Sequence, residues 1–260
     1  MGYDLFNLKG KTALITGGNS GIGLGMANAL AQSGADICIW GTNPEKNASA
    51  VERLESKGTN VKSFQCDVSN EKAVESCFSE TLSIFGRVDA CFANAGIGSL
   101  GMRFNEMTTE EWKTVMDINL DGFFYTMRIA SRHMVERAKN GDPGGRLIGT
   151  SSLGAICGMA KAEHYAASKG AVISIMQGLA VELARFAITA NSILPGHIET
   201  GMTELRYKDE RFSNAILPRI PMRRWGNPDD FGGIAVYLMS DASRYHTGDS
   251  FLIDGGFFLN

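Results

Sequence analysis

The feature that most constrains the fold of this chain is the regular alternation of short β-branched runs with longer helical patterns. The runs predict strands over residues 12–16, 36–40, 61–66, 88–93, 146–150, 189–194 and 250–253. The patterns between them predict helices over residues 21–33, 44–57, 71–85, 109–139, 165–185 and 229–239. Strands separated by helices of crossover length form a parallel sheet with helices on both faces. The sequence therefore predicts an α/β fold whose ligands bind beyond the carboxyl ends of the strands.

Residues 1–260 are predicted to form one domain, because no linker, repeat or low-complexity segment divides them. Hydrophobic residues make up 44% of the chain and charged residues 20%, which is enough apolar material for a full core. The stretch 194–227 is the least regular part. Because an insertion of that length in a compact domain is usually functional, we expect a substrate lid at about 202–225.

Charge and cysteine content argue against several classes of protein. A formal net charge of −3 disfavours a nucleic-acid partner or a basic membrane-surface protein. No window approaches the roughly 18 consecutive apolar residues of a membrane span, and the N-terminus lacks the pattern of a signal peptide. The chain has 5 cysteines and no CxxC pair, which favours free thiols in a reducing compartment. We therefore expect a cytoplasmic protein that binds no metal.

The stretch TGGNSGIG, residues 16–23, joins the first strand to the first helix. Its glycines permit a tight turn, and the unpaired N–H groups of the helix N-terminus suit a pyrophosphate. A plain turn is the alternative, because the spacing differs from the usual GxGxxG. The predicted phosphate site consists of Gly17, Asn19, Ser20, Gly21, Ile22 and Gly23.

Three later strand ends are expected to complete a dinucleotide site at the same edge of the sheet. Asp67 would accept a hydrogen bond from an adenine amino group, although a role as a helix cap fits the sequence equally well. Small residues after the fourth strand would allow close backbone approach. These predicted contacts are Thr42, Asn43, Asp67, Val68, Asn94, Ala95 and Gly96.

Tyr165 and Lys169 stand four residues apart in EHYAASKGAV, so they share one face of a helix. An ammonium beside a phenol favours the phenolate, and it is therefore expected to lower the pKa of Tyr165 and suit it to acid–base chemistry. Ser152, just after a strand, would bind the substrate oxygen. An exposed Tyr/Lys pair is the alternative reading of this spacing.

Taken together, TGGNSGIG, ANAG at 93–96, Asn119 in DINLDG, Ser152, YAASK at 165–169 and LPGHIET at 194–200 resemble the short-chain dehydrogenase/reductase family, and the resemblance covers residues 8–256. It implies a Rossmann-type, doubly wound sheet of seven parallel strands, a nicotinamide cofactor and a homotetramer. The implied catalytic set is Asn119, Ser152, Tyr165 and Lys169.

The resemblance also implies a role for each of these residues. Tyr165 transfers the proton, Lys169 binds the nicotinamide ribose and lowers the pKa of Tyr165, and Asn119 holds a water. Ser151 rivals Ser152, which lies at the family's usual 13 residues before the tyrosine. The chain departs from the family pattern at Ala93 and in the glycine that follows Ser152 one place early. The turn beside the nicotinamide is implied to contain Pro195, Gly196, Ile198 and Thr200.

Cofactor preference follows from the end of the second strand, where Gly41 stands in place of a carboxylate. A carboxylate there would hold the ribose of NAD and repel the extra phosphate of NADP. Because that repulsion is absent, Thr42, Asn43 and Lys46 could donate to the phosphate. No arginine occupies position 20 or 42, so we expect both cofactors to work, with a slight preference for NADP.

The predicted function is transfer of a hydride between the nicotinamide and a secondary alcohol or ketone. The segment MTELRYKDERFSNAILPRIP resembles the sugar-acid branch of the family, near gluconate 5-dehydrogenases and 2-deoxy-3-ketogluconate dehydrogenases, so we expect a small hydroxylated acid or sugar derivative. A 3-oxoacyl-carrier-protein reductase and a non-catalytic dinucleotide-binding protein are the alternatives. His197 could line the pocket, and one or two lid arginines could clamp a carboxylate. The candidates are Arg206, Arg211, Arg219, Arg223 and Arg224.

Overall fold

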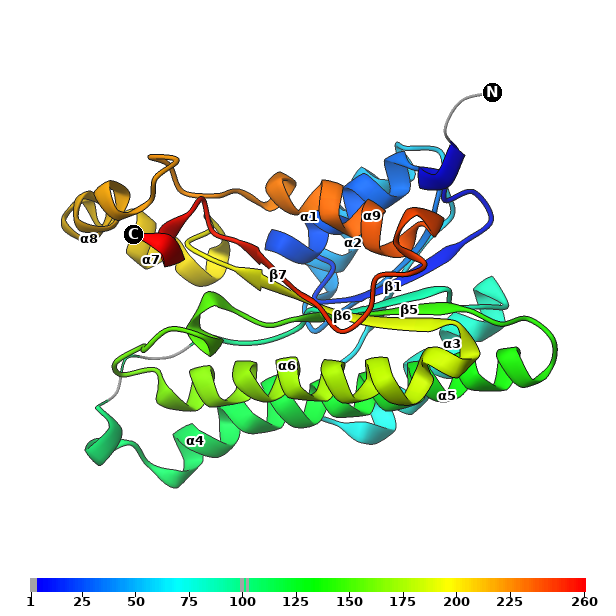
Figure 1. Cartoon of the computed structure of the whole chain (residues 1–260), viewed down its shortest axis with the longest axis horizontal. Coiled ribbons are helices and arrows are strands. Elements are labelled where there is room, and N and C mark those ends of the chain that lie inside the picture. The colour runs from blue at the N-terminus through cyan, green and yellow to red at the C-terminus, as the bar shows by residue number, and fades with distance from the viewer. Residues whose placement is uncertain (1–3, 99–100, 102) are drawn as a thin grey trace.

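The computed structural model describes residues 4–98, 101 and 103–260. A 7-stranded sheet runs through the molecule in the order β3-β2-β1-β4-β5-β6-β7 (Figure 1). All neighbouring strands are parallel. The strands are β1 (Thr12–Thr16), β2 (Asp36–Gly41), β3 (Val61–Gln65), β4 (Ala90–Ala93), β5 (Gly145–Thr150), β6 (Ile188–Pro195) and β7 (Ser250–Ile253).

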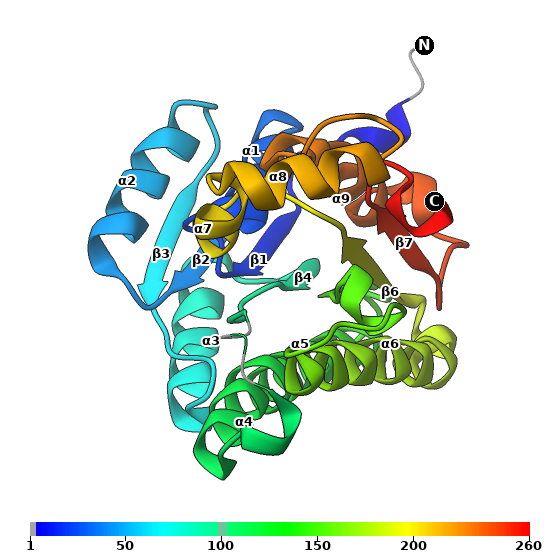
Figure 2. The ribbon, with the colours of Figure 1, turned by 90° about the vertical axis from the view of Figure 1, so that its left-hand side faces the viewer.

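Helices cover both faces of this sheet (Figures 1 and 2). One face carries α1 (Gly21–Gln32), α2 (Pro44–Glu55) and α9 (Gly232–Met239). The other carries α3 (Glu71–Phe85), α4 (Thr109–Met116), α5 (Gly122–Lys139) and α6 (Glu163–Leu183). The predicted doubly wound, Rossmann-type fold is therefore confirmed.

Two apolar cores follow from the alternation of side chains along each strand. Ile37 and Ile39 of β2 pack on the side of α1 and α9, whereas Cys38 and Trp40 pack on the side of α3 and α5. Because both faces of the strands are buried, β1 and β5 have no exposed residue. This double burial explains the continuous apolar runs in the sequence.

Local signals set the ends of several helices. Asn70 caps α3 by accepting a hydrogen bond from the backbone N of Ala73 at 3.2 Å, and Gly86 ends that helix with a φ of 73°. Asn43 caps α2 in the same way, accepting from the backbone N of Lys46 at 2.8 Å. These caps explain why α3 has the predicted bounds and why α2 begins where predicted.

The predicted single helix over 109–139 is wrong in one respect. A π-helical turn, Asp117–Asp121, separates α4 from α5 and places Asn119 inside the molecule with 1% of its surface exposed. Insertions of this kind occur frequently at functional sites because they redirect a side chain without ending the helix. Residues 229–239 likewise divide into a 3₁₀ turn, Pro228–Phe231, and α9.

The irregular stretch 194–227 contains two short helices, α7 (Glu204–Tyr207) and α8 (Glu210–Ile216). They lie across the carboxyl edge of the sheet, on the side that faces the viewer in Figure 2. The C-terminus lies near them in Figure 1. Across the described ranges, no helix combines the length and the apolar character needed to cross a membrane.

Candidate active site

The glycine-rich turn leads from β1 into α1 at the carboxyl edge of the sheet. Gly17 and Gly21 have φ values of +63° and +52°, a region that disfavours side chains. A Cβ on Gly23 would lie 2.3 Å from the carbonyl oxygen of Gly17, so this position also requires glycine. The side chain of Ser20 makes no capping bond to α1. The first N–H groups of that helix therefore remain available to a phosphate.

The nicotinamide segment borders the same turn. A Cβ on Gly21 would come within 3.3 Å of Cγ2 of Thr200, so the two loops flank one space. Gly196 packs against Asp254, where a Cβ would meet the Asp254 Cβ at 2.6 Å. The buried Ile198 bridges to Gly226. The residues predicted for the pyrophosphate and those predicted for the nicotinamide are thus neighbours at the carboxyl edge, and they fit a nicotinamide dinucleotide.

The ends of β1, β4 and β5 are joined through Thr16 and Asn94. Thr16 Oγ1 accepts hydrogen bonds from the backbone N of Asn94 at 3.0 Å and of Ala95 at 2.9 Å. Asn94 donates from Nδ2 to the carbonyl of Thr16 at 3.1 Å, and the Thr150 hydroxyl donates to Asn94 Oδ1 at 3.3 Å. The Asn94 side chain therefore holds the ends of β1, β4 and β5 together beneath the site. A Cβ on Gly96 would meet Asn119 Oδ1 at 3.0 Å, which keeps that floor open.

Asp67 does not cap α3, because Asn70 does so. Its Oδ1 instead accepts from the backbone N of Ser69 at 3.0 Å and from the Ser69 hydroxyl at 2.7 Å. The cap that the sequence left open for Asp67 is thus excluded. The neighbouring Val68 is buried against the start of α5, since a Cβ on Gly122 would meet its Cγ2 at 2.7 Å.

Asn119, Ser152, Tyr165 and Lys169 come together beyond β4 and β5. The side-chain amide of Asn119 makes two hydrogen bonds to the backbone of Ile97. Its Oδ1 accepts from the Ile97 N at 2.8 Å, and its Nδ2 donates to the Ile97 carbonyl oxygen at 3.0 Å. Lys169 Nζ donates to the carbonyl of Thr150 at 2.8 Å and lies 6.0 Å from the centroid of the Tyr165 ring. The structure thus gathers residues that are 50 positions apart in the sequence into one cluster.

The two candidate serines have different partners. The Ser151 hydroxyl is buried and donates to the backbone carbonyl of Lys169 at 2.7 Å. Ser152 instead hydrogen-bonds with the phenol of Tyr165, and its oxygen accepts from the backbone N of Gly154 at 3.1 Å. Of the two hydroxyls, Ser152 is therefore the one that lies beside the tyrosine.

The acid–base properties of the cluster differ from the prediction in one point. Burial lowers the pKa of Lys169 to about 8. Burial also raises the pKa of Tyr165, and the hydrogen bond with Ser152 and the charge of Arg206 oppose that shift without overcoming it. The predicted lowering of the Tyr165 pKa by Lys169 is wrong for the chain's own groups, because desolvation of the phenolate dominates.

The aromatic residues of the predicted lid, 202–225, pack around one tryptophan. The Trp225 ring meets Tyr207 of α7 at 6.2 Å and Phe212 of α8 at 6.3 Å between centroids. Trp225 also packs edge-on against His197 at 5.3 Å, and His197 packs on Phe257 at 4.7 Å. These contacts place α7 and α8 beside the loop that follows β6.

The arginines of the predicted lid are not equivalent. Burial lowers the pKa of His197, and the charge of Arg206, which also acts on Tyr165, lowers it further. Arg219 lies 4.5 Å from the centroid of Phe257, and Arg224 pairs with Asp230 at 2.7 Å. Arg223 donates to the carbonyl of Pro218. Of these arginines, Arg206 is the one whose charge reaches the tyrosine.

One buried residue of the site has no counterpart in the sequence predictions. Asn47, in α2, is 3% exposed and hydrogen-bonds with Asn19 of the glycine-rich turn. An asparagine within a helical pattern indicates a surface position when it is read locally. Its role depends on β2 and β3, which lie beside it after folding.

Comparisons with known proteins agree with this geometry. A family model described as "Enoyl-(Acyl carrier protein) reductase" matches residues 17–258. The 2-dehydro-3-deoxy-D-gluconate 5-dehydrogenase of Pseudoalteromonas atlantica is 40% identical over 96% of this chain and 97% of its own. The 5-keto-D-gluconate 5-reductase of Escherichia coli is 36% identical over 98% of both chains.

A solved structure extends the comparison. The gluconate 5-dehydrogenase of Burkholderia cenocepacia, crystallised with NADP and tartrate, superimposes with a TM-score of 0.90 at 34% identity. The alignment covers 99% of this chain and 98% of that one. Fold and sequence are thus shared with this enzyme over almost the full length.

Proposed function

The chain belongs to the short-chain dehydrogenase/reductase family, and on that premise we propose which substrate it takes and which residues act on it. It is an NAD(P)-dependent oxidoreductase that transfers a hydride between the nicotinamide and a secondary alcohol or ketone. The proposed substrate is a small hydroxylated acid or a sugar derivative. Relatives named as dehydrogenases or reductases of gluconate derivatives support this choice.

The proposed reaction relies on four side chains of this chain. The Ser152 hydroxyl binds the substrate oxygen, and the adjacent Tyr165 phenol donates a proton to it in reduction and accepts that proton in oxidation. Lys169 contributes positive charge beside the phenol and a donor for the cofactor ribose. Asn119 shapes the turn that carries Ile97 and starts a proton path. The nicotinamide, when bound, gives or takes the hydride.

The observation that carries the substrate proposal is the charge of Arg206. This lid residue acts electrostatically on both Tyr165 and His197, so an anionic substrate between them would meet a guanidinium. Within the described part of the chain, no hydrogen bond or ion pair holds Arg206. Its guanidinium is therefore available to a carboxylate, which it can bind through two parallel hydrogen bonds.

A substrate panel tests this function. Purified protein is assayed with sugar acids, polyols, neutral sugars and 3-oxoacyl thioesters, each with both cofactors, by the absorbance of the reduced nicotinamide. Turnover of a sugar acid, with weaker turnover of its neutral analogue, is the expected result. Good activity on steroids or acyl thioesters, with none on hydroxylated acids or sugars, would refute the substrate proposal.

A 3-oxoacyl-carrier-protein reductase is the second candidate, favoured by a relative of that name in Chlamydia pneumoniae that is 35% identical over 96% of this chain and 97% of its own. That activity requires a basic surface for an acidic carrier protein. The same panel decides between the two candidates. A preference for the thioester that increases when it is attached to a carrier protein would support the second.

The proposal extends to assembly and to the lid. Val181 of α6 is 84% exposed and Phe124 of α5 is 44% exposed, which supports a homotetramer that buries these helices. The segment 202–225 acts as the lid, and the reducing cytoplasm is the proposed location. Light scattering that shows a monomer at micromolar concentration would contradict the tetramer.

A further inference from the structure

Asn47 has an amide whose orientation is dictated by the protein around it. Its Nδ2 donates to the carbonyl oxygen of Gly41 at 3.0 Å and to that of Phe64 at 3.2 Å. An amide nitrogen carries two hydrogens, and both are used. The opposite orientation would turn the amide oxygen toward two carbonyl oxygens. The Asn47 Oδ1 must therefore point away from the strands, toward the glycine-rich turn.

That oxygen fixes a second amide. Asn19 Nδ2 donates to Asn47 Oδ1 at 2.7 Å, and the Ser20 hydroxyl donates weakly to Asn19 Oδ1 at 3.4 Å. Because the Asn47 oxygen can only accept, Asn19 must present its nitrogen to it. One N–H and the carbonyl of Asn19 then remain for a ligand. The two asparagines form an amide relay from the carbonyls of β2 and β3 to the predicted cofactor site.

The relay occupies the space above Gly41. A Cβ built on Gly41 would lie 2.2 Å from Asn19 Nδ2 and 2.6 Å from Asn47 Oδ1. Dinucleotide folds commonly place a carboxylate at the end of this strand to hold the ribose 2′-hydroxyl. In this chain the Asn19 amide stands where such a side chain would begin. A carboxylate at position 41 and an ordered Asn19 therefore exclude each other.

We propose that Asn47 is a positioning residue for cofactor recognition, which holds the Asn19 amide at the 2′ position of the adenosine ribose. The neutral amide can donate its remaining N–H to a 2′-phosphate in a charge-assisted hydrogen bond, and it offers a 2′-hydroxyl only a weaker, neutral one. It repels neither cofactor. The relay thus explains how the chain can use both cofactors while leaning toward the phosphorylated one.

The alternative is that Asn47 has a purely structural role and only holds α2 against β2 and β3. Losing a structural residue would lower the thermal stability of the protein and would weaken the binding of all adenosine ligands alike. Losing the relay should instead change the ratio of affinities for ligands with and without a 2′-phosphate. The ratio is the readout that separates the two roles.

The first test measures binding of adenosine 2′,5′-bisphosphate and of 5′-AMP by calorimetry to the full chain. Asn47→Ala and Asn19→Ala should each weaken the bisphosphate about fivefold, the effect of one lost hydrogen bond, with AMP changed less than twofold. The matched control is Asn191→Ala. Asn191 is also buried, at 1% exposure, and bonds to the backbone of His246 and Asp249.

Asn191→Ala should lower the melting temperature and leave the affinity ratio unchanged. Equal weakening of both ligands by Asn47→Ala would overturn the proposal. Should Asn47→Ala not fold, Asn19→Ala decides, because its side chain is part-buried and carries no backbone partner of its own. An unchanged ratio in Asn19→Ala would likewise overturn it.

The second test uses the predicted exclusion at position 41. Gly41→Asp alone should show a lower melting temperature and little gain in the NADH-to-NADPH affinity ratio, measured by cofactor fluorescence. Gly41→Asp combined with Asn19→Ala and Asn47→Ala removes both amides that a side chain at position 41 would meet, and should raise that ratio about tenfold over the single variant. The same ratio in both variants would show that the two amides do not control the position.

Discussion

The carboxylate of Asp89, at the amino ends of the central strands, is paired with cations, whereas the ammonium of Lys169, at their carboxyl ends, has no ion partner among the described residues. Asp89, just before β4, accepts from the backbone N of Thr12 at 2.9 Å. The same carboxylate pairs with Arg87 at 2.6 Å and with Arg137 at 3.2 Å. Every oxygen of this buried carboxylate therefore has a partner.

Lys169, at the opposite end, is 5% exposed and donates to a neutral carbonyl, that of Thr150. Within the described ranges, no carboxylate pairs with it. Burial of an unpaired ammonium destabilises the folded state, which is why its pKa falls. Perturbed groups of this kind gather at functional sites.

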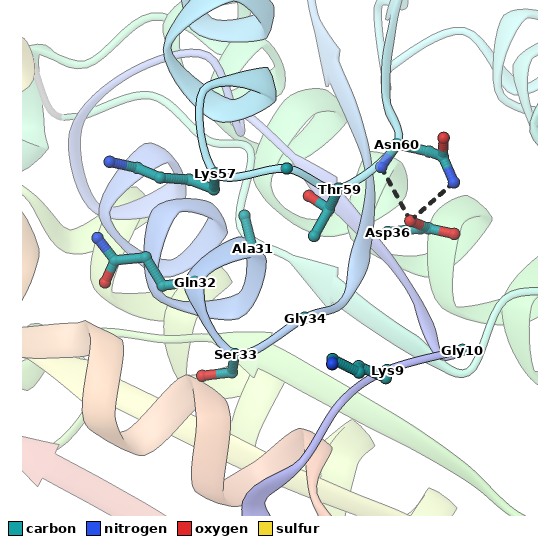
Figure 3. Close-up of a pocket in the computed structure, with 11 residues that line it drawn as sticks. Lys9, Gly10, Ala31, Gln32, Ser33, Gly34, Asp36, Lys57, Thr59 and Asn60 are labelled. Carbon is teal, nitrogen blue, oxygen red and sulfur yellow. Dashed lines mark hydrogen bonds between the residues drawn. The ribbon is translucent and has the colours of Figure 1, made fainter.

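A hollow alone does not identify the functional end. Figure 3 shows the residues that line a hollow before β1, β2 and β3, among them Lys9, Gly34 and Asn60. The volume of this hollow is about 440 Å³. Its carboxylate, Asp36, accepts from the backbone N of Asn60 at 2.9 Å and from the Asn60 side chain at 3.1 Å. This hollow lies at the far end of the sheet from Tyr165. The difference is that the charge of Asp89 is placed to stabilise the fold, whereas the unpaired charge of Lys169 lowers stability, and we propose that it is kept for the reaction.

The largest effect is expected at the carboxyl end. Tyr165→Phe removes the proton donor and should lower kcat about a thousandfold. Cofactor affinity, measured by fluorescence, should stay within twofold, because the phenol contributes a proton and little binding. Activity within tenfold of the wild type would end the assignment of Tyr165.

The matching change at the amino end should affect stability and leave the chemistry intact. Asp89→Ala removes the buried ion partner of Arg87 and Arg137, which keep only Asp142, and leaves the backbone N of Thr12 without its acceptor. The free energy of unfolding should therefore fall by about 3 kcal/mol. Urea denaturation measures this loss, and kcat per folded molecule should be unchanged. Asp36→Ala, which breaks bonds to Asn60 alone, should cost about 1 kcal/mol. A large loss of kcat in either variant would contradict the prediction that residues at the amino ends of the strands affect stability alone.

The buried Lys169 should make the free energy of unfolding depend on pH. Its pKa is about 8 in the folded chain and ordinarily 10.5, so between these values the unfolded chain binds more protons. Stability therefore rises with pH through this window, by up to about 3 kcal/mol for this group. Below pH 8 the full penalty is present.

Lys169→Met should thus be more stable than the wild type at pH 7, with an advantage that shrinks toward pH 10, while its activity falls. Urea midpoints of both proteins at several pH values provide the measurement. An advantage that does not change with pH would show that the buried ammonium carries no penalty.

The smallest effect concerns the lid. Arg206→Ala should raise KM for a sugar acid about tenfold, the effect of a lost charge-assisted hydrogen bond, and should leave KM for a neutral polyol within twofold. Arg211→Ala, on the exposed side of α8, is the control and should change neither value. An equal rise in KM for the acid and for the polyol would show that Arg206 does not bind the substrate carboxylate. That result would not exclude a sugar acid as the substrate.

The sequence alone determined the features that depend on neighbours within a few residues. The helix α3 has the bounds predicted from the sequence, because its caps, Asn70 and Gly86, act on the adjacent backbone. The glycine-rich turn and the Tyr165–Lys169 spacing are equally local, and the parallel direction of the strands follows from the crossover length of the helices between them. Motif order then identified the family and the cofactor class.

The tertiary structure decided whatever depends on burial or on residues far apart in the chain. It separated Ser152 from Ser151 by giving their hydroxyls different partners, and it divided the long helix at Asn119. The direction of the Tyr165 pKa was mispredicted because spacing reveals a nearby charge and not the loss of water around a phenolate. The role of Asn47 could not be predicted for a related reason. The orientation of its amide depends on carbonyl groups of β2 and β3, which lie beside it only after folding.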